Sequence, residues 1–155
     1  MRRKDRERDG DFALSVADKC EWAVVTVVTP EGEPYGVPVS VVRDGDNLYF
    51  HTAKEGKKID ALKADPRVWV VCVGDVERAV HSFTTGYESA MFGGECREVT
   101  DENEKVRALR LLCEKYTPQN MNNFDSAVEA SLPRTGVYRI KLLSSSGKAK
   151  VLKRQ

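Results

Sequence analysis

The sequence lacks several features that would assign its class at once. No apolar run among its 155 residues comes near the roughly 20 residues that span a bilayer. The basic start, residues 1–9, has no apolar stretch behind it, so we expect no secretory signal and a cytoplasmic location. With 25 Lys and Arg against 24 Asp and Glu, the chain also lacks the positive charge of a general nucleic-acid binder. We expect one soluble domain over 1–155 that binds neither nucleic acid nor membrane.

Motifs for several chemistries are absent as well. There is no Gly-x-Gly-x-x-Gly or Walker motif, no Gly-x-Ser-x-Gly and no His-Glu-x-x-His, so no common nucleotide-binding or hydrolase signature is present. The four cysteines are widely separated, at Cys20, Cys72, Cys96 and Cys113. Without a Cys-x-x-Cys pair, and with His51 and His81 in different segments, we expect free buried thiols and no metal site.

Segments of strand character dominate the chain and follow one another in hairpins. Strands are expected at about 22–29, 35–43, 48–52, 67–73, 83–99 and 136–143, and helices at about 12–20, 56–65, 101–116 and 122–131. Because strands and helices do not alternate regularly, a doubly wound parallel sheet is disfavoured. The fold class expected is mainly β with flanking helices: an antiparallel barrel of about six strands.

Individual residues refine this outline. Pro38 cannot donate to a β-ladder, so its strand is expected at an edge or broken there. Gly93 and Gly94 together suggest a bulge or bend. Trp22 and Trp69 lie within apolar strands and are expected in the core, and the strand at 67–73 is apolar enough to be covered on both faces.

The near-zero net charge hides an uneven distribution. Residues 54–67 carry five basic and three acidic side chains, and residues 134–155 carry seven basic and none acidic, whereas the rest of the body is acidic. We expect a charged N-terminal arm over 1–10 and a solvated basic tail over 144–155. The two basic segments are where the chain would meet an anion.

The most informative stretch is the end of one strand and the start of the next helix. Gly56 opens the turn, and Lys57 and Lys58 stand in the first turn of the helix. Free N–H groups and two ammonium groups at a helix start favour a phosphate, although lysines on a solvated helix face give the same pattern. His51, at the end of the strand, could bond a cofactor carbonyl or be a satisfied core histidine.

His51-x-Ala53-x-x-Gly56-x-Lys58 resembles the phosphate-and-flavin motif of the pyridoxamine 5′-phosphate oxidase-like superfamily, and most of all its nitroimidazole-resistance (Nim) branch. Residues 35–40, 83–94 and 104–116 resemble further segments of that branch in the same order. The resemblance implies an FMN-binding split β-barrel that forms a homodimer, with one FMN at each of two interfacial sites.

The resemblance also assigns residues to parts of the cofactor. Lys57, Lys58 and Ser89 would contact the phosphate, and Tyr87 would lie near the phosphate or the ribityl chain. The isoalloxazine would be bordered by Val39, Ser40 and Val41, mainly through backbone groups, and its pyrimidine side by His51, Thr52 and Ala53. The chain has no counterpart of the C-terminal Arg and Trp motif of true pyridoxamine phosphate oxidases, so that activity is not expected.

The function expected is that of an FMN-dependent reductase of a small electron-poor substrate, a nitro-compound or a quinone, with NAD(P)H as a possible electron donor. The cofactor carries such chemistry, so no protein acid or base is required, and His51 is the best candidate for a catalytic role. Two alternatives stay open: haem or a deazaflavin on the same barrel, with His51 or His81 as axial ligand to haem, or a non-catalytic flavin-binding or regulatory module.

Overall fold

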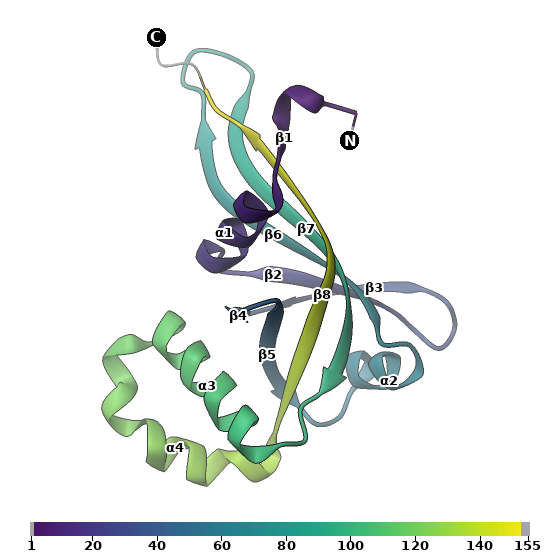
Figure 1. Ribbon diagram of the computed structural model, residues 1–155, viewed down its shortest axis with the longest axis vertical. Helices are drawn as coiled ribbons and strands as arrows, with labels where there is room; N and C mark the ends of the chain where they lie inside the picture. Colours follow the sequence, from purple (N-terminus) through teal and green to yellow (C-terminus); the bar gives the residue numbers. More distant parts are fainter. Residues whose placement is uncertain (1, 153–155) are drawn as a thin grey trace.

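The computed structural model describes residues 2–152 and consists of one antiparallel sheet with helices packed on it (Figure 1). The strands are β1 (Glu7–Arg8), β2 (Ala23–Val28), β3 (Pro34–Val39), β4 (Val42–Asp44), β5 (Asn47–Ala53), β6 (Arg67–Arg78), β7 (Thr85–Glu98) and β8 (Thr135–Lys150). The α-helices are α1 (Gly10–Lys19), α2 (Lys57–Ala64), α3 (Glu102–Tyr116) and α4 (Phe124–Ser131). Short 3₁₀ helices lie at η1 (Lys4–Arg6), η2 (Pro118–Asn123) and η3 (Leu132–Arg134).

The sheet is a split barrel whose two edge strands are consecutive in the chain. Its strand order is β3-β2-β6-β7-β8-β5-β4, with β1 added beside β8. Only Ser40 and Val41 separate the end of β3 from the start of β4. Three Cα–Cα steps reach at most about 11 Å, so the sheet must curl until its two edges lie close together. The predicted fold class is confirmed, with eight strands among the described residues and with the barrel not closed by hydrogen bonds.

The link between the edges is held by the end of α3. The Val41 N–H donates to Tyr116 Oη at 3.0 Å, and the Tyr116 hydroxyl donates to the Val41 carbonyl at 2.8 Å. Lys115 Nζ donates to the same carbonyl at 2.9 Å and to the Ala17 carbonyl at 3.2 Å. Because Val41 is fully buried, these side chains satisfy backbone groups that water does not reach.

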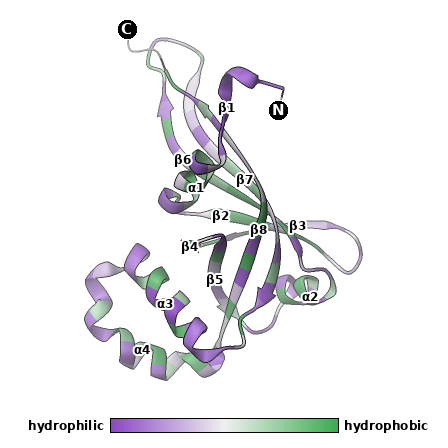
Figure 2. Cartoon of the chain, viewed as in Figure 1, coloured by the Kyte–Doolittle hydropathy of each residue, from purple (hydrophilic) through white to green (hydrophobic). Residues whose placement is uncertain are grey.

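Strand β5 separates two hydrophobic cores. Leu48 and Phe50 point into the core beneath α1, whereas Tyr49 points the other way, into a second core formed with α3 and α4. Successive side chains of a strand face opposite sides, so three consecutive buried residues require a layer on each face. Tyr49 also donates to Glu104 at 2.8 Å, which fixes the start of α3 on the sheet. Figure 2 shows α3 and α4 as amphipathic helices.

Local chemistry defines the ends and bends of several elements, and two local predictions, the bulge at Gly93–Gly94 and the edge position of the Pro38 strand, are confirmed. Asp9 caps α1 and Asp101 caps α3, each by accepting a backbone N–H. The register of β7 against β8 shifts between Gly93 and Gly94, as expected for a bulge. A Cβ at Gly94 would lie 2.4 Å from the Lys141 carbonyl oxygen, so only glycine fits there. Pro38 lies in β3, which is an edge strand as expected. Pro38 itself pairs with Val24, so the strand does not break at the proline and the chain leaves the sheet only after Val39. None of the described helices has the length and apolar character needed to cross a membrane.

The C-terminal segment differs from its prediction. Residues 144–150, expected in a solvated tail, extend β8, where they pair with β7 over their whole length. The end of β8 also pairs with β1 in the N-terminal arm, Glu7 with Lys148 and Arg8 with Gly147. The polar composition of this segment is compatible with a strand because β7 pairs with all of it and β1 pairs with Gly147 and Lys148 on the other side. Residues 153–155 lie outside the described part.

The expectation that both tryptophans are core residues is wrong for the single chain. Trp22 is 64% exposed and Trp69 is 52% exposed. In β6, Val68 and Val70 point inward, so Trp69 points outward by the alternation of a strand. Val73 and Met91 are exposed on the same side of the sheet, and this outward apolar face is not covered by any described residue of the chain.

Replacement of Tyr116 by Phe tests how much the Val41 contacts stabilise the fold. The variant leaves a buried N–H and carbonyl without the hydroxyl, and we expect the free energy of unfolding to fall by about 2 kcal/mol in denaturant titrations. Tyr35→Phe is the matched control, since the Tyr35 hydroxyl makes no hydrogen bond within residues 2–152. Equal losses in the two variants would contradict the role given to Tyr116.

Candidate functional site

The turn from β5 into α2 forms an anion-binding cradle. Gly56 caps α2 with φ of +123°, a conformation that glycine adopts without steric cost. Its carbonyl accepts from Ile59 and Asp60, whereas the N–H groups of Lys57 and Lys58 bond no backbone carbonyl in the described part of the chain. Free N–H groups at a helix start attract an anion.

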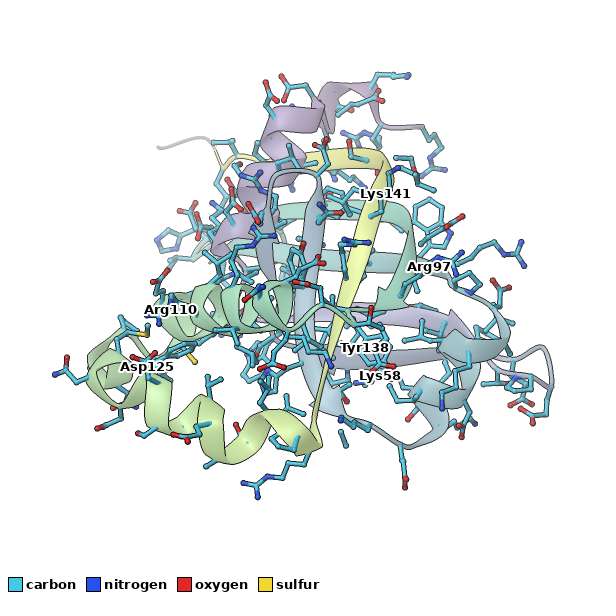
Figure 3. All side chains as sticks on the ribbon, turned by 60° about the horizontal axis from the view of Figure 1, so that its bottom comes forward. Lys58, Arg97, Arg110, Asp125, Tyr138 and Lys141 are labelled. Carbon is cyan, nitrogen blue, oxygen red and sulfur yellow. The ribbon has the colours of Figure 1, made fainter. Side chains whose placement is uncertain are left out.

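The ammonium groups of the same two lysines each lie over an aromatic ring. Lys57 Nζ lies 5.0 Å from the centroid of the Tyr35 ring, and Lys58 Nζ lies 5.1 Å from that of Phe50, which stacks on Tyr138. Lys58 and Tyr138 are labelled in Figure 3. Neither lysine forms an ion pair with any carboxylate among residues 2–152. Burial lowers the pKa of Lys58, so an anion bound here would stabilise a cation that otherwise lacks a counter-charge.

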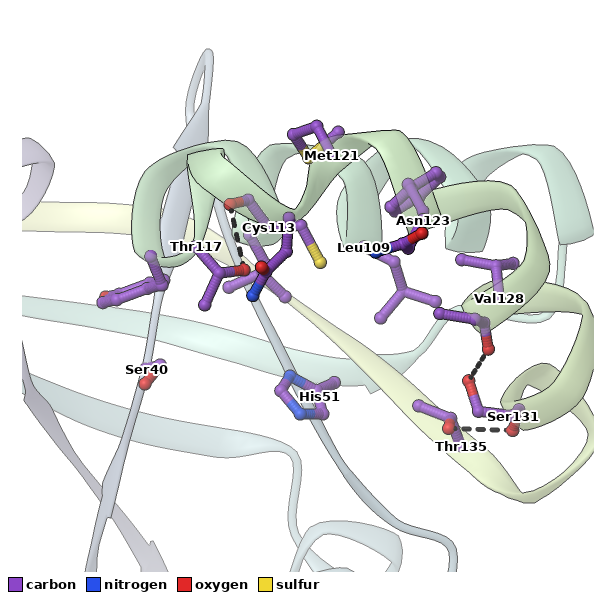
Figure 4. A pocket seen from close by; sticks show the side chains of 15 residues that line it. Ser40, His51, Leu109, Cys113, Thr117, Met121, Asn123, Val128, Ser131 and Thr135 are labelled. Carbon is purple, nitrogen blue, oxygen red and sulfur yellow. Dashed lines mark hydrogen bonds between the residues drawn. The ribbon is translucent and has the colours of Figure 1, made fainter.

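A pocket of about 740 Å³ lies on the other face of the end of β5 (Figure 4). Fifteen residues from the β3–β4 link, β5, α3, η2, α4 and the start of β8 line it. His51 forms part of its floor, because His51 lies on the same face of β5 as Tyr49, which packs against α3. The pocket therefore opens where the second core ends and α3 and α4 diverge from the sheet.

The surroundings of His51 favour the neutral form of its imidazole. Burial disfavours the imidazolium, and the nearby Lys58 ammonium disfavours it further, so the pKa of His51 is lowered. The residue as a whole is nevertheless exposed, and it lines the pocket. At neutral pH the uncharged ring can thus accept one hydrogen bond and donate another.

The three residues expected beside the isoalloxazine, Val39, Ser40 and Val41, differ in how accessible they are to a ligand. Ser40 lines the pocket together with His51, whereas the side chains of Val39 and Val41 are buried in the first core. The Val41 backbone groups are engaged by Tyr116 and Lys115, so a ligand could use them only by replacing those bonds. Ser40 is therefore the member of this set that is open to a ligand.

Thr52 and Ala53 end strand β5, beside the pocket. Ala53 is exposed and pairs with Thr135, itself a lining residue, while Thr52 is half-buried and points to the opposite face. One chain thus brings together Ser40, His51, Thr52, Ala53, Lys57 and Lys58 around the end of β5.

Tyr87 and Ser89 lie elsewhere in the same chain. Ser89 is six residues along β7 from Glu95, which pairs with Arg67 just after α2, and six residues of strand span about 20 Å. Tyr87 accepts a hydrogen bond from Arg6 at 3.3 Å, and Lys148 Nζ lies 5.7 Å from its ring centroid. The hydrogen bond from Arg6 is the largest cause of a lowered pKa of Tyr87, and Lys148 lowers that pKa further. These residues form a second basic cluster, which cannot share a phosphate with Lys57 and Lys58 of the same chain.

The second basic cluster borders the outward apolar face. Ser89 pairs with Val73, Met91 with Val71 and Gly93 with Trp69, so these residues alternate with the buried side of the sheet. The side chains of Tyr87 and Ser89 consequently point to the side on which Trp69, Val73 and Met91 are exposed. Whatever covers that face would also contact Tyr87 and Ser89.

Sequence reasoning missed the pocket walls supplied by α3, η2 and α4. Leu109, Cys113 and Thr117 lie on one side of α3 and its end, with the spacing of a helix face. That spacing predicts an amphipathic helix, but it does not show which part of the apolar face is left uncovered by the rest of the chain and lines a pocket. All four cysteines are free as predicted, three of them buried, and Cys113 half-buried in this wall. No cluster of three or more potential metal ligands occurs in the described residues.

A scan of protein families matches residues 17–149 to the family described as pyridoxamine 5′-phosphate oxidase. The chain belongs to this family. Within the family, the resemblance to the nitroimidazole-resistance branch is confirmed by a solved structure from Bacteroides thetaiotaomicron, described as a 5-nitroimidazole antibiotic resistance protein. The two chains are 26% identical, with a TM-score of 0.76, over 92% of this chain and 84% of the other.

Two further solved structures share the fold of this chain. The flavocytochrome Anf3 of Azotobacter vinelandii is 21% identical, with a TM-score of 0.81, over 98% of this chain and 72% of the other. An FAD- and haem-binding protein of Mycobacterium smegmatis is 19% identical, with a TM-score of 0.78, over 94% and 73%. No curated protein matches the chain significantly. Family membership indicates a flavin-binding protein.

The electrostatic coupling between His51 and Lys58 gives a prediction for NMR titration of the His51 ring. Lys58→Met should raise the pKa of His51, since it removes a neighbouring cation, but not fully to the ordinary value, because burial is the larger cause. Lys57→Met is the control, because Lys57 does not contribute to the shift. An unchanged His51 pKa in Lys58→Met would show that the two groups are not coupled.

Proposed function

We propose that the protein is an FMN-dependent reductase of a small electron-poor substrate, and that it works as a homodimer with FMN at the interface. The observation that carries this proposal is the cradle at the start of α2, where Lys57 and Lys58 present charge without a carboxylate partner. A phosphate monoester fits that cradle, because it accepts backbone N–H bonds and two charge-assisted bonds at once.

The residues around the end of β5 suit the remainder of such a cofactor. Lys57 and Lys58 would hold the phosphate, while Ser40, His51, Thr52 and Ala53 would border the ring. FMN supplies hydride or electron transfer when bound, so the protein has to bind the cofactor, orient the substrate beside it and exclude water from the site. His51, neutral at the floor of the pocket, can donate one hydrogen bond there and accept another.

The split of the predicted phosphate residues supports the homodimer. Tyr87 and Ser89 lie about 20 Å along the strand from the part of β7 that is beside α2, too far to act on the same anion within one chain. They point to the outward apolar face, where Trp69 and Met91 are 52% and 44% exposed. A second copy on that face would cover apolar surface and bring its own residues to Tyr87 and Ser89.

The double variant Lys57→Ala, Lys58→Ala tests the phosphate position. Two charge-assisted bonds are lost, and we expect FMN affinity to fall by at least about 100-fold, which corresponds to about 3 kcal/mol. The measurement is fluorescence titration of cofactor-free protein with FMN, after mass spectrometry has identified the cofactor released from the native protein. Lys63→Ala, at the other end of α2, is the control and should bind FMN as the unmodified protein does. Unchanged affinity in the double variant would place the phosphate elsewhere.

A mixed dimer tests whether two copies build each site. One chain carries Lys57→Ala and Lys58→Ala, and the other carries Tyr87→Phe and Ser89→Ala, with different affinity tags. If each site takes the lysines of one copy and Tyr87 and Ser89 of the other, the mixed dimer has one intact site and one doubly altered site. It should then bind one FMN per dimer, measured by absorbance, whereas the two altered homodimers bind far more weakly. A mixed dimer as weak as those homodimers would mean that each site belongs to a single chain.

Haem in the pocket is a second candidate, favoured by one observation: His51 presents a neutral imidazole, the form that ligates iron, in a largely apolar cavity. His81 is exposed, between β6 and β7 and away from the pocket, so it does not serve there. A Soret band without flavin bands in the native protein would favour haem, and flavin bands alone would favour FMN.

A further inference from the structure

The pocket beneath α3 and α4 extends well beyond the residues expected to hold a flavin. Of the predicted cofactor residues, only Ser40 and His51 line it, and the other walls come from α3, η2, α4 and the start of β8. Its volume of about 740 Å³ lies in the range of small-molecule sites. The lysine cradle is on the opposite face of β5, since Lys58 stands over Phe50 whereas His51 faces the helices. The pocket and the cradle thus take their side chains from opposite faces of β5, with Lys58 close enough to lower the pKa of His51.

The pocket wall carries no full charge. None of its fifteen lining residues, all within the described part of the chain, is Asp, Glu, Lys or Arg. Arg110 and Asp125, the charged residues where α3 meets α4, bond each other at 2.9 Å instead (Figure 3). The His51 imidazole is neutral, because burial and Lys58 lower its pKa. A carboxylate or phosphate that entered would lose hydration without gaining a counter-charge.

The polar groups of the pocket are suited to a neutral molecule. The hydroxyls of Thr117, Ser131 and Thr135 donate to the backbone carbonyls of Cys113, Ala127 and Ser131, as Figure 4 shows, so their remaining capacity is to accept. The amides of Asn120 and Asn123 are exposed at the rim and can donate. Between these groups the surface is apolar, formed by side chains such as Leu109, Leu112 and Phe124.

We propose that the α3–α4 pocket binds an uncharged, largely apolar small molecule and rejects its anionic counterparts. Its role as the substrate site rests on the proposed function: the electron acceptor would be an uncharged nitro-compound or quinone, placed between His51 and the helices. The protein would then use charge to sort its two ligands, with anions directed to Lys57 and Lys58 and neutral molecules to the pocket.

Calorimetric titration with a matched pair of probes tests this inference. 4-Nitrobenzyl alcohol and 4-nitrobenzoate share a ring and a size but differ in charge. We expect the alcohol to bind the native protein, with its cofactor, at least about 10-fold more tightly than the carboxylate, because the pocket offers no counter-charge. This comparison needs no variant and no turnover. Equal affinities, or a preference for the carboxylate, would overturn the proposal.

Variants of α4 test whether the probes bind in this pocket. Ala127 and Ala130 are both exposed on this helix, and of the two only Ala127 lines the pocket. Ala127→Phe should weaken binding of the alcohol by about 10-fold, because the larger side chain occupies its space. Ala127→Lys should shift the ratio of the two affinities toward the carboxylate by about 10-fold, because it adds a counter-charge. Ala130→Phe and Ala130→Lys should change neither. Effects that are the same at both positions would overturn the assignment to this pocket.

The cofactor content of the same samples, read by absorbance, separates this inference from the proposed function. Flavin-loaded protein that does not discriminate between the probes refutes the pocket inference alone. Protein that discriminates as expected but contains no flavin supports the pocket as a site for neutral molecules and refutes the flavin-dependent reductase.

Discussion

The connection of β3 to β4 through Ser40 and Val41 is the constraint on which the rest of the structure depends. Two residues join opposite edges of the sheet, so the sheet must curl, and the curl places β5 between two cores. Tyr116 and Lys115 fix that link by bonding the Val41 backbone, and in doing so they fix the end of α3. The wall of the pocket and the edge of the barrel are therefore held by the same few hydrogen bonds.

The charged side chains are distributed unevenly around this frame, although the net charge of the chain is close to zero. The basic segment at 54–67 supplies the cradle of Lys57 and Lys58, and the basic C-terminal segment supplies Lys148 beside Tyr87. In one chain the two clusters are separated along the sheet, and the pocket wall is uncharged. Each cluster is small, which suits a local anion such as a phosphate rather than a polyanion.

Much of the fold could be predicted from the sequence, because its signals are local. The caps at Asp9 and Asp101 and the bulge at Gly93–Gly94 follow from chemistry within a few residues. The motif from His51 to Lys58 indicated the family and the anion cradle for the same reason. The exposure of Trp69 could not be predicted, since an apolar strand looks the same whether its second face is covered by its own chain or left open.

By itself, then, the sequence determined the types of most elements, the fold class and the position of the two lysines at a helix start, because propensity, capping and spacing act over short distances. Only the tertiary structure decided that Tyr87 and Ser89 stand apart from those lysines and that the Val41 backbone is engaged by Tyr116. It alone also decided that α3 and α4 leave an uncharged pocket over His51. These outcomes depend on how strands pair and on which helix faces meet the sheet, and such long-range pairing leaves no local mark in a sequence.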